Sequence, residues 1–211
     1  MRTCYDKHPT WKHIVWTNQN LPVPFIFKKE WELDNNNARR SDLLRLQILF
    51  NHGGVYLDTD MECIKPIDNL LSGYNFVMAT ECSHVGKNKK FSGPCDQKHI
   101  NNAVIASTKE NPTVYELMMK VKENYQNDEI DTSGKPVTYV SKLSGPTLYN
   151  KNKRLIYANR GAKLYTNEYF YPVHYSNRKK MEDWQIPTNP KFLSENTHMI
   201  HHFAASWYKQ K

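Results

Sequence analysis

Residues 41–70, SDLLRLQILFNHGGVYLDTDMECIKPIDNL, constrain the fold of this chain more than any other stretch. Their first part carries leucine and isoleucine at spacings that give a helix a broad apolar surface, and Ser41 or Asp42 is placed to cap its start. Two glycines then end the helix. The run Val-Tyr-Leu that follows is short, β-prone and largely apolar, which is typical of a strand buried on both faces. The stretch therefore predicts a helix, a glycine turn and a buried strand.

Acidic residues follow the predicted strand at alternate positions: Asp58, Asp60 and Glu62. Alternate residues of an extended chain project to the same side. Two carboxylates in an Asp-x-Asp arrangement, where a strand reaches solvent, supply hard oxygen ligands for Mg²⁺ or Mn²⁺, which completes its coordination with phosphate oxygens and water. A bare Asp-x-Asp also occurs in ordinary polar turns after strands. The whole string is more specific than these residues alone.

The residues SDLLR at 41–45 followed by GGVYLDTD at 53–60 resemble the signature of the DXD-containing sugar transferases of glycosyltransferase family 32, which includes capsular-polysaccharide and yeast-type mannosyl transferases. The string is also similar to the catalytic domains of the large clostridial glucosylating toxins. About thirty residues match, with helix, turn, strand and acidic cluster in the family's order. The resemblance implies one GT-A-type α/β domain over residues 1–211, or one domain of a longer polypeptide. Its sheet would be mixed, mostly parallel and flanked by helices, with the donor site at the strand ends.

The resemblance also implies roles for residues of this string. Asp58 and Asp60 would hold Mn²⁺ or Mg²⁺ against the diphosphate of a nucleotide sugar. Asp42 and Arg45 would hydrogen-bond the donor sugar, and Tyr56 would pack beside it. One helical turn separates Asp42 from Arg45, so both side chains can project from one face; a plain intrahelical ion pair is the alternative.

The C-terminal run HMIHHFAASW at 198–207 is similar to the family's closing HH-x-x-x-SW motif. In the toxins, the position five before the tryptophan carries a carboxylate metal ligand. Counting back from Trp207 therefore predicts His202, rather than His201, as a further metal ligand. Ser206 and Trp207 would contact the diphosphate and close over it. The alternative is a C-terminal tail that docks through Phe203 and Trp207.

Two further segments bear on the donor site. Residues 11–16, WKHIVW, are predicted to form a strand that resembles the family's second strand. Family members normally carry an earlier strand with an aromatic residue that stacks on the base, and there is no room for it before Met1. Trp16 or Trp11 is the candidate substitute, with a core tryptophan as the alternative. Asn102, in a run similar to a family strand, lies near the donor sugar or is a buried amide satisfied by backbone.

The remaining patterns predict the frame around the site. A helix opens at Asn111-Pro112 with an apolar stripe for the core, and a second helix begins near Pro146. Residues 81–97 lack periodicity and predict a mobile surface loop. Basic and aromatic residues alternate after Lys151. This pattern predicts either a groove that binds the acceptor or ordinary strands and loops around a core.

Composition limits the class of protein and its partners. The length suits one domain, and no apolar run approaches the ~20 residues of a membrane span. The net charge of +8 suits an anionic nucleotide sugar or an anionic membrane or glycan surface. The basic residues are scattered, so no nucleic-acid partner is predicted.

The chain opens without a signal peptide, which predicts a cytoplasmic enzyme of a bacterium or a virus. Without CxxC spacing, the cysteines are predicted to be reduced thiols: Cys4, Cys63, Cys82 and Cys95.

The predicted function is metal-dependent transfer of a hexose from a nucleotide-diphosphate sugar to an acceptor hydroxyl of a glycan or glycoprotein. The resemblance implies retention of anomeric configuration, with UDP-glucose as the favoured donor and GDP-mannose as its competitor. One alternative is a nucleotide-sugar-binding module without turnover. Another alternative is a metal-dependent phosphotransferase or nuclease. The absence of a P-loop motif argues against it.

Overall fold

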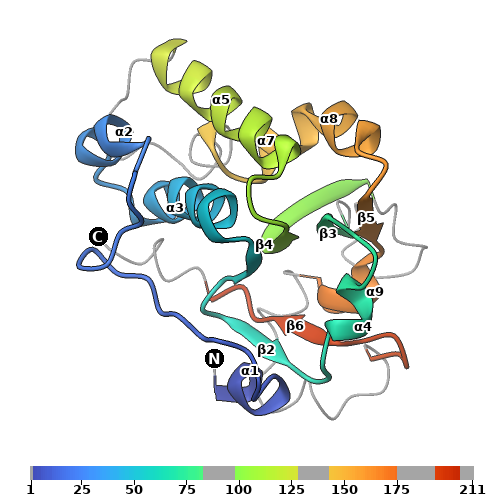
Figure 1. Cartoon of the computed structure of the whole chain (residues 1–211). Helices are drawn as coiled ribbons and strands as arrows, with labels where there is room; N and C mark the ends of the chain where they lie inside the picture. Colours follow the sequence, from blue (N-terminus) through green and yellow to red (C-terminus); the bar gives the residue numbers. More distant parts are fainter. Residues whose placement is uncertain (1, 83–97, 128–142, 175–192, 205–211) are drawn as a thin grey trace.

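The computed structural model describes residues 2–82, 98–127, 143–174 and 193–204, with a four-stranded sheet at the centre (Figure 1). The strands are β1 (Gly54–Leu57), β4 (His99–Ser107), β3 (Phe76–Glu81) and β5 (Ala162–Tyr165), in that order across the sheet. β3 and β5 are parallel, whereas β4 is antiparallel to both β1 and β3. The prediction of a mixed sheet flanked by helices is confirmed. Among the described strands of this sheet, β1, β3 and β5 run in the same direction, and β4, which lies between β1 and β3, runs opposite to both.

Four helices cover one face of this sheet (Figure 1): α3 (Asn37–His52), α5 (Pro112–Asn127), α7 (Pro146–Lys151) and α8 (Lys153–Ala158). The stripe predicted for the helix after Asn111-Pro112 is confirmed, since the four α5 residues in it are at most 1% exposed: Val114, Leu117, Met118 and Val121. They pack in one cluster with Leu43, Leu46 and Leu49 of α3 and with Phe76 and Met78 of β3. Burial of such side chains stabilises each by about 1.5–3 kcal/mol. α2 (Lys28–Leu33) precedes this layer in the chain.

A smaller layer covers the other face: a two-stranded sheet of β2 (Met61–Cys63) and β6 (Met199–His201), with the short helices α1 (Arg2–Lys7), α4 (Asp68–Leu71) and α9 (Asn167–Phe170). Alternate residues of a strand face opposite sides of the sheet. Val77 and Ala79 of β3 accordingly join a second apolar cluster with Met61, Phe170 and Met199. The central sheet is thus sandwiched between a helical layer and this smaller layer.

The helix of the central string begins earlier than predicted. α3 starts at Asn37, and the side chain of Asn36 accepts hydrogen bonds from the backbone N–H groups of Ala38 and Arg39 at 3.0 and 3.2 Å. Asparagine is among the best N-cap residues. Ser41 and Asp42, predicted as the cap, therefore lie inside the helix.

The glycine turn and the strand after it are found where predicted. Gly53 has φ 69°, and a Cβ there would approach the backbone nitrogen of Lys109 to 2.7 Å, so this position requires glycine. β1 differs from the prediction in one respect: it is an edge strand whose last three residues are only half-buried. An edge strand has a neighbour on one side only, which leaves part of its surface accessible.

The N-terminal segment differs most from the prediction. Residues 11–16 form no strand, and the described N-terminal element is α1. The structure joins Cys4 of α1 to Cys63 of β2 in a disulfide with Cα atoms 4.8 Å apart, and Cys82 is disulfide-bonded too. The prediction of reduced thiols is therefore wrong for these three cysteines. Cys4 and Cys63 are 59 residues apart, so local spacing carries no signal of the pair.

Two further predictions concern a membrane span and the loop at residues 81–97. Within the described residues, no helix is both long and apolar enough to cross a membrane. The loop predicted at residues 81–97 lies almost entirely outside the described part of the chain.

Candidate active site

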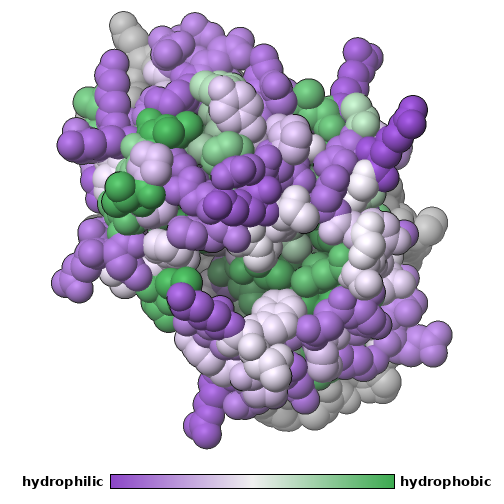
Figure 2. Space-filling model, in the orientation of Figure 1, coloured by the Kyte–Doolittle hydropathy of each residue, from purple (hydrophilic) through white to green (hydrophobic). Residues whose placement is uncertain are grey.

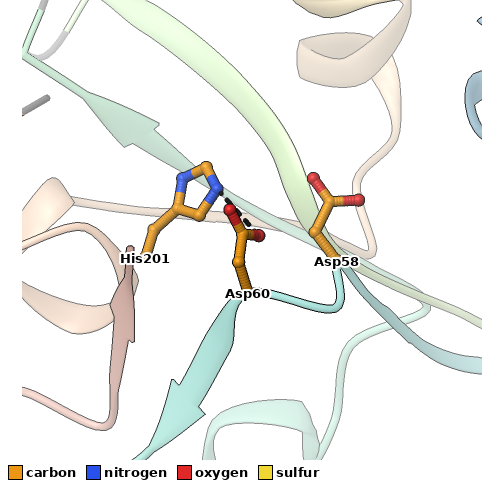
Figure 3. A group of neighbouring side chains, drawn as sticks. All are labelled: Asp58, Asp60 and His201. Atoms are coloured by element: carbon orange, nitrogen blue, oxygen red, sulfur yellow. Dashed lines mark ion pairs between the residues drawn. The ribbon is translucent and has the colours of Figure 1, made fainter. Parts of the chain in front are cut away.

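Three side chains converge where β1 ends and the small sheet begins (Figure 3): Asp58, Asp60 and His201. Asp58 directly follows β1, and its N–H donates to the carbonyl of Ala103 in β4 at 2.9 Å. Asp60 precedes β2, and β2 pairs with β6 so that Met61 lies opposite His201. One candidate ligand atom from each of the three side chains lies within 4.8 Å of the others. The turn and the sheet pairing thus bring together residues from distant parts of the sequence.

Asp60 is held as a carboxylate by its neighbours. Its Oδ1 lies 3.3 Å from Nε2 of His201, and its Oδ2 accepts a hydrogen bond from the N–H of Ala204 at 2.8 Å. Partial burial by itself would raise the pKa of Asp60, but the hydrogen bond and charge of His201, together with the Ala204 N–H, outweigh it and lower the pKa to about 2. Asp60 is therefore ionised at neutral pH and available as an oxygen ligand.

The structure places His201, rather than the predicted His202, beside Asp60. His202 points instead to Glu62, with Nε2 and Oε2 2.8 Å apart, while His201 faces Asp60. Neighbouring residues of an extended chain project to opposite sides, so only one of the two histidines can face the aspartates. Counting residues back from Trp207 did not fix which one, because the choice depends on the register between β2 and β6.

Arg45 connects the helix to the acidic cluster. Its Nη2 lies 2.9 Å from Oδ1 of Asp42, one turn earlier in α3, and 3.3 Å from Oδ1 of Asp58. Its Nη1 donates to the carbonyl of Asn102, and its guanidinium carbon lies 4.6 Å from the centre of the Tyr56 ring. Burial would lower the pKa of Arg45, but the charges of Asp58 and the other acidic groups raise it above its usual value. The intrahelical ion pair weighed in the sequence analysis exists, and it extends to Asp58.

Asp42 is buried at 4% exposure and fully hydrogen-bonded. Oδ1 accepts from the side-chain amide of Asn102 at 3.0 Å and Oδ2 from the hydroxyl of Ser144 at 3.1 Å. Burial raises the pKa of Asp42 to about 6, although Arg45 acts to lower it. Asn102 is thus satisfied by a carboxylate rather than by backbone. The sequence analysis did not identify Ser144 as part of this cluster; its only signal was its place just before the helix that starts at Pro146.

Tyr56 fixes the orientation of Asp58. The Tyr56 hydroxyl donates to Oδ1 of Asp58 at 2.9 Å, and the Ser41 hydroxyl lies 2.9 Å from the same phenolic oxygen. Burial raises the pKa of Tyr56 above its usual value, so the hydroxyl stays protonated and remains a donor. Ser41, predicted as a helix cap, therefore acts through Tyr56 on the acidic cluster.

A pocket of about 440 Å³ extends from Asp58 along the accessible face of β1. Val55 and Leu57 of β1 line its floor, and Trp11 and Lys12 of the N-terminal segment are among the residues of its wall. The space-filling view, in the orientation of Figure 1, shows a hollow with apolar residues at its floor on this face (Figure 2). The pocket combines apolar surface, an aromatic ring and basic groups next to the carboxylates.

Other predicted residues lie elsewhere. Trp16 does not line this pocket; its ring stacks on His52 at the end of α3, with the ring centres 5.5 Å apart. Of the two tryptophans considered as base-stacking residues, Trp11 is the one beside the pocket. Ser206 and Trp207 lie outside the described residues.

The residues present fit a divalent cation. Two carboxylates and one imidazole offer hard and intermediate donors, a set that suits Mn²⁺ or Mg²⁺ and leaves other coordination positions for phosphate oxygens and water. Arg45 lies on the far side of Asp58, where it balances part of the negative charge that the cluster carries without a cation.

A comparison with known proteins finds a family match over the first part of the chain. Residues 1–77 match a family model described as "Glycosyltransferase sugar-binding region containing DXD motif". Inositol phosphoceramide mannosyltransferase 3 of Schizosaccharomyces pombe is 30% identical over 92 residues, which cover 41% of this chain and 26% of that protein. Toxin Afp18 of Yersinia ruckeri is 32% identical over 120 residues, 56% of this chain and 5% of the toxin.

Among solved structures, the PaToxG glycosyltransferase aligns with a TM-score of 0.43 and 24% identity over 64% of this chain and 40% of that chain. The chain thus spans about a quarter of the mannosyltransferase and a small part of the toxin that it matches. The part of the chain that carries α3, β1 and both aspartates of the acidic cluster matches the sugar-binding region of the DXD-containing glycosyltransferases.

Proposed function

We propose that this chain is a glycosyltransferase domain of the GT-A type that transfers a hexose from a nucleotide-diphosphate sugar to an acceptor hydroxyl on a glycan or glycoprotein. The observation that carries the proposal is the convergence of Asp58, Asp60 and His201, together with a pocket of about 440 Å³ that Asp58 also lines. The match of residues 1–77 to a sugar-binding region containing the DXD motif supports the same class of reaction.

Each residue of the site has a role in this proposal. Asp58, Asp60 and His201 would hold Mn²⁺ or Mg²⁺, and the cation would supply Lewis-acid stabilisation of negative charge on the nucleotide diphosphate. Asp42 and Arg45 orient the donor sugar, and the ion pairs of Arg45 with Asp42 and Asp58 hold its guanidinium in place for this role. The Tyr56 hydroxyl keeps Asp58 in position.

The pocket along β1 accommodates the nucleoside of the donor. Trp11 offers an aromatic face for the base, and Lys12 adds positive charge for the phosphates. Transfer with retention of configuration needs no side chain as a strong base, which agrees with a site where Asp58 pairs with Arg45 and Asp60 pairs with His201. All 211 residues belong to this one domain in the proposal.

The donor sugar and the location of the protein are separate questions. UDP-glucose is the donor favoured by the sequence, whereas the mannosyltransferase relatives favour GDP-mannose. Disulfides persist in oxidising compartments. The cytoplasmic location stays a prediction, and the redox state of Cys4 and Cys63 in the native cell tests it.

Calorimetric titration of both nucleotide sugars, with and without Mn²⁺, tests the proposal. We expect Mn²⁺-dependent binding of one donor to the wild type and loss of that binding in Asp60→Ala. Glu62→Gln is the matched control, because Glu62 is a neighbouring carboxylate that pairs with His202 and lies outside the ligand group. Absence of binding by either donor, or binding that Asp60→Ala leaves intact, would contradict the proposed site.

A second candidate function is a nucleotide-sugar-binding module without turnover. It shares the site and differs only in the outcome of an assay for donor hydrolysis or transfer. Metal-dependent release of the nucleotide from the bound donor would exclude it, whereas tight binding with no release over hours would favour it.

A further inference from the structure

The strand β4 is irregular beside the candidate site. Its register with β3 changes from Val77 opposite Ala106 to Ala79 opposite Asn101. Residues 102–105 of β4 therefore face only Met78 of β3. Such a bulge re-aims side chains and leaves some backbone groups without partners in the ladder.

The bulge supplies three contacts to the site. The side-chain amide of Asn102 donates to Asp42 at 3.0 Å, and the carbonyl of Asn102 accepts from Arg45. The carbonyl of Ala103 accepts from the N–H of Asp58 at 2.9 Å. The shape of the bulge thus sets the positions of the α3 charges relative to the first aspartate of the acidic cluster.

Two backbone N–H groups of the bulge are satisfied by side chains instead of by β3. The side-chain oxygen of Asn101 accepts from the N–H of Ala103 at 2.8 Å. The hydroxyl of Tyr171 accepts from the N–H of Val104 at 2.9 Å. Tyr171 follows α9 and is only 2% exposed, so this hydroxyl occupies the place that a strand carbonyl would otherwise take.

Tyr171 also contacts the other wall of the site. Its ring packs edge-on against the ring of His201, with centres 5.9 Å apart and an interplanar angle of 62°. His201 in turn faces Asp60 at 3.3 Å. One buried side chain therefore touches both the bulge behind Asp58 and the histidine beside Asp60.

We infer that Tyr171 is a positioning residue, which sets the spacing between Asp58 and the Asp60–His201 pair by supporting the β4 bulge with its hydroxyl and His201 with its ring. The inference rests on the proposed function for its consequence in metal and donor binding. Tyr171 itself neither holds the cation nor contacts the reacting atoms. Its side chain links two elements from different sheets, because the hydroxyl contacts β4 and the ring contacts His201 of β6.

The test compares Tyr171→Phe with Tyr125→Phe. Tyr125 is a matched control: it is also buried, and its hydroxyl donates to Asp34 at 2.8 Å, between α5 and the segment before α3. Both variants keep the ring and lose one buried hydrogen bond, so both should melt at lower temperature than the wild type. We expect only Tyr171→Phe to weaken Mn²⁺ binding in calorimetry, by at least fivefold, with a matching loss in kcat for donor hydrolysis.

A second readout keeps the inference independent of the proposed function. Hydrogen exchange of the segment 101–106 should be faster in Tyr171→Phe than in Tyr125→Phe, whether or not the protein binds a nucleotide sugar. Asn101→Ala, which removes the acceptor of the Ala103 N–H, should move the same readouts by a second route if Tyr171→Phe does not fold. Equal exchange in the two tyrosine variants, or unchanged Mn²⁺ affinity in Tyr171→Phe, would overturn the inference. If the wild type binds neither metal nor donor, the proposed function fails, and the exchange data alone decide on Tyr171.

Discussion

At the scale of single residues, the site consists of two coupled charge groups that share Asp58. Asp58 lies beside Asp60 and His201 on one side and beside Arg45 on the other. Arg45 forms an ion pair with Asp42, so a change of charge at Asp42 alters the electrostatic environment of Asp58, and the reverse holds too. Substitutions here are therefore expected to be non-additive, in contrast to substitutions at well-separated positions.

The two histidines at the end of β6 give the first prediction. His201→Ala removes a candidate ligand, so we expect Mn²⁺ affinity to fall at least tenfold. His202→Ala breaks the pair with Glu62, which should lower the melting temperature and leave Mn²⁺ affinity within twofold of the wild type. Calorimetric titration with Mn²⁺ alone distinguishes them. The reverse order of effects would restore the original choice of His202.

The carboxyl group of Asp42 gives a prediction on pH. Its pKa is about 6 in the folded protein and about 3.9 in an unfolded chain. Between these values the folded state retains a proton that the unfolded state has lost, so the free energy of unfolding falls as pH rises from about 4 to about 6, by at most about 3 kcal/mol. Thermal melts of the metal-free protein should show this slope, and Asp42→Asn should flatten it. A wild type and an Asp42→Asn variant with the same slope would contradict the assignment.

At the scale of elements, local sequence patterns predicted individual helices and strands, but they did not predict features that depend on how strands pair. Pro112 and the apolar stripe that follows were sufficient to predict α5 and its buried face. The start of α3 differs from the prediction because Ser41 and Asp42 are residue types that can cap a helix, although Asn36 is the residue that does so. The half-exposed state of β1 and the choice of His201 depend on strand order and register, which no local pattern contains.

The link between α1 and β2 gives the prediction for this scale. The double variant Cys4→Ser with Cys63→Ser removes a crosslink across 59 residues, for which chain-entropy arguments give a loss of about 4 kcal/mol. Urea denaturation of the variant and of the wild type, both without reductant, measures the change in the free energy of unfolding and leaves the disulfide of Cys82 intact. Because α1 and the segment after it line the pocket, donor binding should weaken as well. Identical denaturation curves for the variant and the wild type would argue against the crosslink.

At the scale of the whole molecule, the class of fold and the order of the elements around the acidic cluster were predictable from the sequence, whereas the strand topology was not. The helix, glycine turn, strand and acidic cluster lie in the predicted order, and the helices flank a mixed sheet. The orientation of β4 between β1 and β3, and the disulfide from α1, are long-range properties. Both features depend on how distant segments pack together, so the sequence alone did not predict them.

The net charge of +8 leads to a prediction for the molecule as a whole. A positive field accelerates the approach of an anionic nucleotide sugar, and salt screens that field over about 10 Å at 0.1 M. Raising NaCl from about 50 to about 500 mM should therefore slow association of the donor several-fold in stopped-flow measurements. The uncharged nucleoside is the control and should bind at a rate independent of salt. A donor association rate that does not change with salt would show that the charge plays no part in capture.

The pairing of β2 with β6 has a consequence for how the protein is made. Asp58 and Asp60 are synthesised long before His201, because β2 and β6 are far apart in the sequence. The helical layer and the central sheet consist of segments that precede β6, so they can assemble on a nascent chain before β6 has been made. We therefore expect nascent chains that stop before β6 to be partly folded and unable to retain a cation, and in the proposed function such chains would not transfer a sugar.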